Sequence, residues 1–475
     1  MIATISFAGI IILGLLGMYS RSAPKTLANW TVSERNIPRW TSWFLQAGES
    51  LTTFAFLGLA GVTFVGGSSA VFAVAYLSLS AIGLYFVAPR IRSLAAARGF
   101  ITQADFFTDR FSSPGLGKTV AAVGVLSLLP YLQLQITGLG LIVQLVTGSE
   151  SARGLSMVVA SLIIVLFVTR SGIRGIARVA YVKDVLMVLA LGTVAGGVLV
   201  GIGGVPDVFA RVAQSDPLLL TLGSDGYDTT FFVTAVVITS LAASFNTFPH
   251  LWPPVLAAES GAVLRSNYKW LALYQLVLLF PIFIGFAAIL TMSSDSSPNK
   301  VMLSVTSMVL PDWLVGVVAV AGASAAMVPA AAISMGISTA VTRNLLSIRD
   351  HRVQLRANHA VVIAAVLCAL GFGLRGPDIT DLLLLTYSGL AQLVPATAIG
   401  LAHKVRAGAV PVMVGIATGL IALVMITFLP LPIGSWDSGL VALGPNILAL
   451  VCCELLRRFR RPTRSAAMDS SKIAA

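Results

Sequence analysis

The chain has 475 residues, of which 57% are hydrophobic and only 11% are charged, and its formal net charge is +12. Soluble domains carry about 25% charged residues, so this chain has too few charges to cover a water-exposed surface of its size. The composition excludes a soluble enzyme and a disordered scaffold. The basic residues form short clusters between apolar runs, which argues against nucleic acid as a partner and for loops beside a lipid bilayer. The sequence predicts an all-α polytopic membrane protein.

Apolar stretches long enough to span the bilayer recur along the whole chain. A spanning helix needs about 20 mostly apolar residues, and about thirteen stretches qualify. The first has no basic segment ahead of it and is interpreted as a retained helix, not a signal peptide. The predicted spans lie near 2–20, 43–66, 70–89, 119–147, 154–169, 183–203, 229–250, 270–292, 313–342, 359–374, 379–402, 408–430 and 438–456.

The basic residues set the predicted orientation. If the N-terminus lies outside, all but four of the 31 Lys and Arg residues fall on the inner side, as the positive-inside rule requires. One inner cluster comprises Arg170, Arg174, Arg178 and Lys183. We therefore expect a multi-pass protein of the inner (plasma) membrane with an external N-terminus and a cytoplasmic C-terminus. The four exceptions are Arg153, Arg211, Lys300 and Arg375.

The second predicted span is interrupted by polar residues at about its middle. The stretch 46–53 reads QAGESLTT and contains Glu49, the only acid well inside an apolar run. An ionisable group within the bilayer is costly and is a functional candidate by default. The alternative is a carboxylate that pairs with a basic neighbour and holds helices together.

The seventh predicted span ends in a cluster of helix-breaking residues. The stretch 244–254 reads SFNTFPHLWPP and carries three prolines around His250. Proline unwinds or stops a helix and frees backbone carbonyl groups. Alternatively, the helix ends at the membrane interface, where tryptophans such as Trp252 are enriched.

The two interrupted spans open consecutive groups of five helices. Discontinuous helices at matching positions of two halves are typical of an inverted-repeat transporter whose site lies at the midplane. We predict a peripheral first helix and inner loop (1–42), one repeat (43–203), an outer loop (204–228), a second repeat (229–402), two peripheral helices (403–456) and a basic cytoplasmic tail (457–475).

Further polar residues within the spans are weaker candidates. Lys183 and Asp184 form either an ion pair or part of an ion exit path. Gln133 follows Pro130 in a polar stripe, and Tyr387 and Gln392 form a similar stripe in a later span. No spacing of Cys, His or acidic residues indicates a metalloenzyme, and we expect neither enzymatic activity nor a cofactor.

Several motifs together resemble the sodium:solute symporter family, which has a five-plus-five inverted-repeat core of the LeuT type. The likeness covers about residues 25–405 and is strongest to the bacterial monocarboxylate permease branch, whose members take up lactate, pyruvate and related short acids. The motifs are AGESLTTFAFLG (47–58), QADFF (103–107), PYLQLQITGLG (130–140), PH (249–250), VPAA (328–331) and TRN (342–344).

The resemblance implies a sodium site between the second and ninth spans. Gly48 and Leu51 match its carbonyl contributors, Ala326 and Ser334 lie in the matching part of the ninth span, and Asp184 matches an acid on the inner exit route. The chain departs from the family pattern at Pro329 and Ala330, where many members have two serines. Glu49 could instead carry a proton if burial raises its pKa.

These observations predict a symporter that couples a small organic anion of the lactate, pyruvate or acetate type to Na⁺ or H⁺ and works by alternating access. Same-fold symport of proline, pantothenate or a sugar is the main alternative, and a channel is a weaker one. The sequence leaves the oligomeric state open. The expected substrate-binding residues are Glu49, Thr52, Thr53, Gln133, Asn246, His250, Tyr387 and Gln392; the expected ion-coupling residues are Gly48, Glu49, Leu51, Asp184, Ala326, Pro329 and Ser334.

Overall fold

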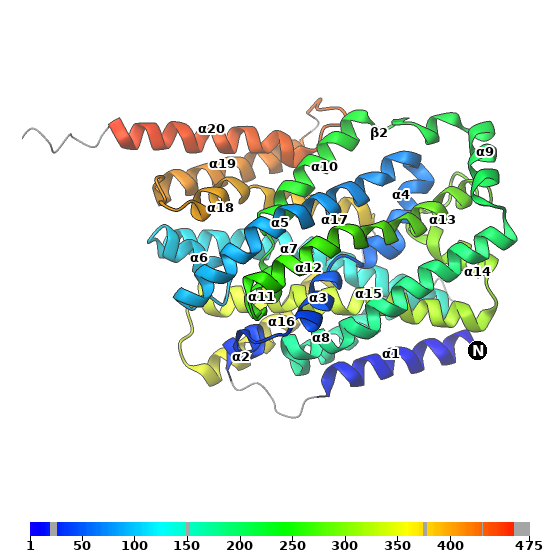
Figure 1. The fold of residues 1–475 in the computed structure, drawn as a ribbon, viewed down its shortest axis with the longest axis horizontal. Helices are drawn as coiled ribbons and strands as arrows, with labels where there is room; N and C mark the ends of the chain where they lie inside the picture. The colour runs from blue at the N-terminus through cyan, green and yellow to red at the C-terminus, as the bar shows by residue number, and fades with distance from the viewer. Residues whose placement is uncertain (20–25, 149–152, 374–377, 430, 460–475) are drawn as a thin grey trace, which may run out of the picture.

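Long apolar helices dominate the computed structural model, which describes residues 1–19, 26–148, 153–373, 378–429 and 431–459. Arg21, Lys25, Arg375 and the tail from residue 460 lie outside these ranges. The helices run roughly alongside one another (Figure 1). Met1 and the end of α20 lie at opposite ends of the bundle.

The first predicted repeat corresponds to a continuous series of helices that follows α1. Its first span is broken, and the long helix α8 is interrupted at Gly172, where φ is +55° and ψ is −175°, a conformation that only glycine adopts readily. The elements are α1 (Ile2–Met18), α2 (Leu27–Val32), η1 (Ser33–Arg35), α3 (Arg39–Ala47), η2 (Phe54–Gly58), α4 (Leu59–Gly66), η3 (Gly67–Val71), α5 (Phe72–Arg98), α6 (Gln103–Arg110), α7 (Pro114–Thr147) and α8 (Arg153–Gly201).

The second predicted repeat follows a short outer segment that contains a two-stranded hairpin. The connecting elements are α9 (Val205–Ser215), η5 (Pro217–Leu220), β1 (Gly223–Ser224) and β2 (Tyr227–Asp228), with β1 and β2 antiparallel. The later helices are α10 (Thr229–Ser244), η6 (Pro249–Leu251), α11 (Trp252–Ala257), α12 (Gly261–Tyr274), η7 (Gln275–Leu278), α13 (Leu279–Ile289), η8 (Pro298–Lys300), α14 (Val301–Val309), α15 (Asp312–Thr339), η9 (Ala340–Leu345), α16 (His351–Gly373), α17 (Ile379–Ala391), α18 (Val394–Leu401), α19 (Ala409–Phe428) and α20 (Ser438–Phe459).

Helix ends follow local sequence signals. α6 begins with a capping box. The Thr102 hydroxyl accepts a hydrogen bond from the Asp105 backbone amide, and the Asp105 carboxylate accepts one from the Thr102 backbone amide. α7 begins at Ser113 and Pro114 and ends at Gly148, whose φ is +68°. These caps fix where each helix enters the bundle.

α15 is the central helix. It contacts α1, α7, α8 and α16, and nearly all of its residues are buried. α5 packs against α10 and α12 on another side, whereas α19 and α20 pack mainly against each other. Of the interrupted spans, α3 packs against α8 and α12, and α10 packs against α5 and α17.

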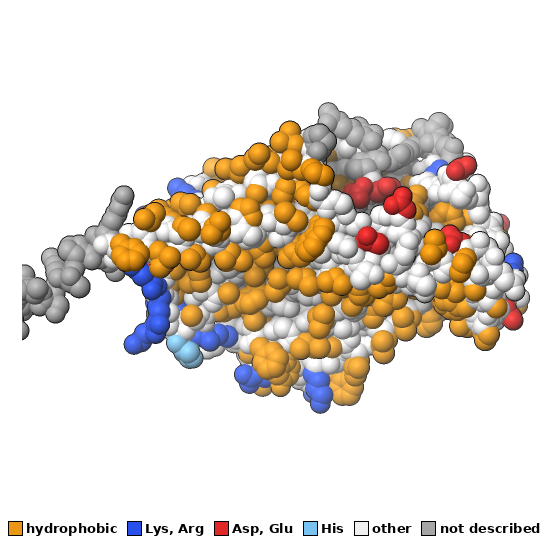
Figure 2. Space-filling model, turned by 90° about the horizontal axis from the view of Figure 1, so that it is seen from above, with side chains coloured by type: hydrophobic (Ala, Val, Ile, Leu, Met, Phe, Trp, Pro, Cys, Tyr) orange, Lys and Arg blue, Asp and Glu red, His pale blue; other side chains and the backbone are white. Residues whose placement is uncertain are grey.

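The described residues contain eight helices long and apolar enough to span a membrane, or ten if each bent pair counts as one span. The predicted count of thirteen is therefore not confirmed, although every predicted span coincides with a helix or a broken helix. Figure 2 shows a largely apolar flank, with Lys and Arg near the end of α20 and acidic side chains toward the opposite half. The chain is a multi-pass membrane protein.

Candidate functional site

A small cavity lies between the two broken spans. Its volume is about 60 Å³, which leaves room for a solute of only a few non-hydrogen atoms. It brings together Glu49, His250 and Tyr387, three of the residues that the sequence predicts to bind substrate. The other lining side chains include Gln46, Ser50, Ser80, Tyr131, Phe248, Tyr268 and Gln275.

The first break separates α3 from η2 and α4. α3 ends at Ala47, and the chain passes through turns until the helix resumes at Phe54. The Gly48 amide still donates to the Phe44 carbonyl at 2.8 Å, so the α3 helix is complete up to this point. Beyond it, the carbonyl groups of the unwound turn are free to bind other groups.

The second break separates α10 from α11, and the two parts are bent by 47°. Asn246 sits at the break with a φ of +52°, a left-handed conformation that asparagine tolerates better than most residues. The Trp252 indole donates to the Asn246 carbonyl at 2.7 Å, and Gln103 of α6 donates to the Thr247 carbonyl at 2.8 Å. Side chains thus satisfy carbonyl groups that the helix has released.

Glu49 and His250 bring the two breaks into direct contact. The Glu49 carboxylate oxygen Oε2 lies 3.4 Å from Nε2 of His250, and both side chains are almost fully buried. The other ring nitrogen of His250, Nδ1, has no hydrogen-bond partner among the described residues. A buried polar atom without a partner is rare in proteins and indicates a place where a ligand or water binds.

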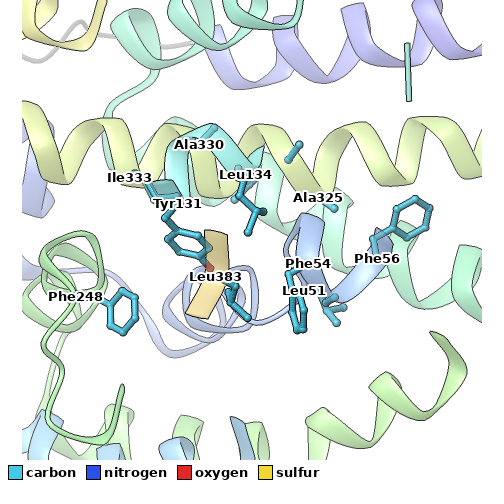
Figure 3. Close-up of a cluster of buried hydrophobic side chains, with 14 of the residues drawn as sticks. Leu51, Phe54, Phe56, Tyr131, Leu134, Phe248, Ala325, Ala330, Ile333 and Leu383 are labelled. Atoms are coloured by element: carbon cyan, nitrogen blue, oxygen red, sulfur yellow. The ribbon is translucent and has the colours of Figure 1, made fainter. Parts of the chain in front are cut away.

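Aromatic rings border the cavity beside this pair. The Phe248 ring lies 4.6 Å from Tyr387 and 5.6 Å from His250, measured between centroids, and Tyr76 packs against Tyr387 at 5.4 Å. Figure 3 shows the Tyr131 side chain between Phe248 and the segment that carries Leu51 and Phe54. The rings make a compact apolar wall on one side of the cavity.

The remaining predicted substrate residues lie at other places. The Thr52 hydroxyl is beside the Tyr131 phenol, next to the cavity. Thr53 donates to Gln135 at 2.6 Å. The Asn246 amide is buried at the second break and has no hydrogen-bond partner among the described side chains.

Gln133 and Gln392 are absent from the described lining of the cavity. The Gln133 side chain packs toward Gly373 of α16. Gln392 sits in a third broken helix, between α17 and α18, and bonds to α20 by donating to the Gly439 carbonyl and accepting from Asn446, both at 3.0 Å. These contacts fix helix packing and do not bring either side chain to the cavity.

The predicted ion-coupling carbonyls are bound by a lysine. The Lys183 Nζ donates to the Gly48 carbonyl at 2.5 Å and to the Leu51 carbonyl at 2.9 Å. It also lies 3.0 Å from the Asp184 carboxylate. The prediction that Lys183 lies in a cytoplasmic loop is wrong, because this side chain is fully buried inside α8. Of the two interpretations of Lys183 and Asp184, the structure shows the ion pair.

α15 has no side-chain oxygen at positions 329 and 330, where the family pattern expects two serines. Ala326, Pro329 and Ala330 are fully or almost fully buried in its middle, and Pro329 deprives the Ala325 carbonyl of its helical partner. The Ser334 hydroxyl, one turn on, is buried without a hydrogen-bond partner among the described residues.

A further polar cluster joins two motifs that the sequence singled out separately. Asp105 of α6 accepts from Arg343 Nε at 2.9 Å and from Asn344 at 2.9 Å, both in η9. It also accepts from the backbone of Ile101 and Thr102. Both motifs were visible in the sequence, but their pairing across 238 residues was not.

The chain is similar over most of its length to bacterial symporters. It is 31% identical to the uncharacterized symporter YhjB of Bacillus subtilis, over 99% of both chains. It is 28% identical to a monocarboxylate transport permease protein of Rhizobium johnstonii, over 68% of this chain and 65% of that one. Its fold matches a Na⁺-coupled sialic acid symporter with a TM-score of 0.80 and 15% identity, covering 96% and 98% of the two chains.

The family model for sodium:solute symporters matches residues 30–396, which include both breaks, the cavity and the Asp105 cluster. Membership implies a transported solute and a sodium ion as partners, and it makes the chain a transporter and not an enzyme. The fold and the broken helices agree with a LeuT-like core. This chain therefore belongs to the sodium:solute symporter family and is a cation-coupled solute symporter.

Proposed function

We propose that this protein imports a small monocarboxylate, of the lactate, pyruvate or acetate type, together with Na⁺ or H⁺ by alternating access. The observation that carries the proposal is the small cavity that Glu49 and His250 line together, with a buried ring nitrogen of His250 that has no hydrogen-bond partner among the described residues. An imidazole N–H is a suitable donor to a carboxylate, and a charge-assisted bond of this kind is stronger than a neutral one.

The surroundings of His250 suit a short, partly apolar acid. Phe248 and Tyr387 offer an apolar wall for a methyl group, and Tyr131 brings a phenol near Thr52. Glu49 lies 3.4 Å from Nε2 of the same imidazole and can hold the ring in position. The likeness to the Rhizobium permease supports the same substrate class.

The proposal includes the direction in which the protein lies across the membrane. The basic end of the molecule in Figure 2 lies where α20 ends, as expected for the cytoplasmic side. Import then carries the solute from the end that holds Met1 toward the end of α20.

The test is uptake of labelled pyruvate or lactate into proteoliposomes, under an inward sodium gradient alone and under a proton gradient alone. We expect accumulation under one of them, with competition by acetate and none by proline, pantothenate or glucose. His250→Ala should abolish it, whereas His403→Ala, at an exposed loop position, should not. Competition by proline, pantothenate or glucose in place of acetate would refute the substrate class and leave the symporter fold intact.

A further inference from the structure

We propose that the ammonium group of Lys183 is the resident cation at the break between α3 and η2, so that this transporter binds no sodium ion there. The inference deepens the proposed function, because it identifies which cation holds this break. It rests on contacts within the described chain and does not depend on the identity of the substrate.

The head group of Lys183 makes two hydrogen bonds and one ion pair. An ammonium donates hydrogen bonds and accepts none; that of Lys183 donates to the Gly48 and Leu51 carbonyls and lies 3.0 Å from the Asp184 carboxylate. The side chain is completely buried. A buried ammonium is stable only when it is paired and hydrogen-bonded, and this one is.

Sodium does not fit the same place. A sodium ion bound to the Gly48 and Leu51 carbonyls would lie next to the Lys183 ammonium, and the two positive charges would repel strongly in a site of low dielectric constant. Hard cations prefer oxygen ligands, and α15 presents Pro329 and Ala330 where hydroxyl groups would be needed. The carboxylate of Asp184 already neutralises Lys183.

The charge balance supports the same conclusion. Lys183 and Asp184 together are neutral, and each compensates the other in a buried environment. Bringing in a sodium ion would add a net charge at a buried site. The lysine gives the break the cationic partner that its carbonyl groups need while keeping the site neutral.

Lys183 acts as a positioning residue. Its side chain links α8 to the unwound turn of the first break, and Glu49, which faces His250, lies between the two carbonyl groups that Lys183 binds. The lysine therefore holds the turn from which Glu49 reaches the cavity.

The first experiment measures sodium binding to the purified protein without transport. The melting temperature in detergent is compared in NaCl and KCl, and we expect no sodium-specific shift for the natural chain. Uptake should likewise proceed at an unchanged rate when KCl replaces NaCl outside, and a sodium gradient alone should drive no accumulation. A sodium-specific rise in melting temperature, or sodium-driven accumulation, overturns the inference.

Variants test whether the lysine is what keeps sodium out. Lys183→Ala frees two carbonyls and a carboxylate, and Lys183→Ala with Pro329→Ser and Ala330→Ser adds two hydroxyl groups. We expect a sodium-specific rise in melting temperature in the single variant and a larger one in the triple variant, with none in the matched control Lys118→Ala, an exposed lysine. Folded variants that stay indifferent to sodium would show that these carbonyls are not a cation site, and would overturn the inference.

The two proposals fail separately. If neither gradient drives uptake of pyruvate or lactate, the substrate assignment falls, and the melting temperatures still decide the role of Lys183. If the natural chain melts higher in sodium, the role of Lys183 falls, and the competition profile still decides the substrate. If the variants do not fold, the comparison of NaCl and KCl on the natural chain alone settles the inference.

Discussion

Gly336 of α15 is a position where one added methyl group should disturb the site directly. A Cβ built on Gly336 would lie 2.9 Å from the backbone nitrogen, the Cα and the Cβ of His250. None of these three atoms can rotate away, so α15 and the second break must move apart. Overpacking of this kind costs about 1–3 kcal/mol.

This cost acts directly on the position of His250. A free-energy change of about 1–3 kcal/mol shifts an equilibrium by about 5-fold to 150-fold, so the arrangement in which His250 meets Glu49 should be depleted by that factor. Alanine otherwise favours a helix over glycine by about 0.5–1 kcal/mol, and this gain offsets only part of the loss. We expect Gly336→Ala to melt at a lower temperature and to lose most of its uptake.

The assay compares Gly336→Ala with Gly192→Ala. Gly192 also lies within a helix, α8, but a Cβ there meets no atom within 4 Å. Gly192→Ala should therefore keep or slightly raise the melting temperature and keep uptake unchanged. Natural melting temperature and natural uptake in Gly336→Ala would refute the close packing of His250 on α15.

Three further substitutions test other parts of the site. Glu49→Gln keeps the side-chain shape but removes the charge 3.4 Å from His250. Accumulation should be lost or its pH profile should shift, whereas the exposed control Glu259→Gln should behave like the natural chain. Unchanged accumulation of Glu49→Gln at every pH tested would contradict this role. Asp105→Asn weakens charge-assisted bonds to Arg343 and Asn344 and should destabilise the protein by about 1–3 kcal/mol in chemical unfolding, whereas Asp109→Asn in the same helix should cost less. Gln392→Ala should lower the melting temperature, because it loses hydrogen bonds to Asn446 and Gly439, and it should leave the KM for substrate unchanged. A raised KM with normal stability would instead indicate that Gln392 contacts the substrate.

The sequence predicts the two helix breaks well, because their causes are local. Clustered prolines after Thr247 and the polar run around Glu49 interrupt helices regardless of the surrounding fold. The structure places both breaks where these residues stand and joins them through Glu49 and His250. That contact was implied only by the general architecture of inverted repeats.

The sequence does not predict which polar residues of a helix face the cavity. Gln133 and Gln392 belong to polar stripes in the sequence, yet they point toward α16 and α20. A stripe shows that a face meets other protein, but a neighbouring helix satisfies amide groups as well as a cavity does. Helix rotation is set by packing between distant segments, which one sequence read alone does not reveal.

The position of Lys183 could not be predicted from the sequence either. In the sequence it follows three arginines near the start of an apolar run and fits a cytoplasmic loop. Its partners are backbone carbonyl groups, which no residue type encodes, and they become available only because a helix more than a hundred residues earlier is unwound at Gly48. Burial of the ammonium is thus a consequence of that break. The one sequence signal that indicated an unusual cation site is the presence of Pro329 and Ala330 where two serines are expected. The two features explain each other: a site that already contains a tethered cation has no use for hydroxyl ligands, and a site without hydroxyl ligands needs another partner for its carbonyl groups.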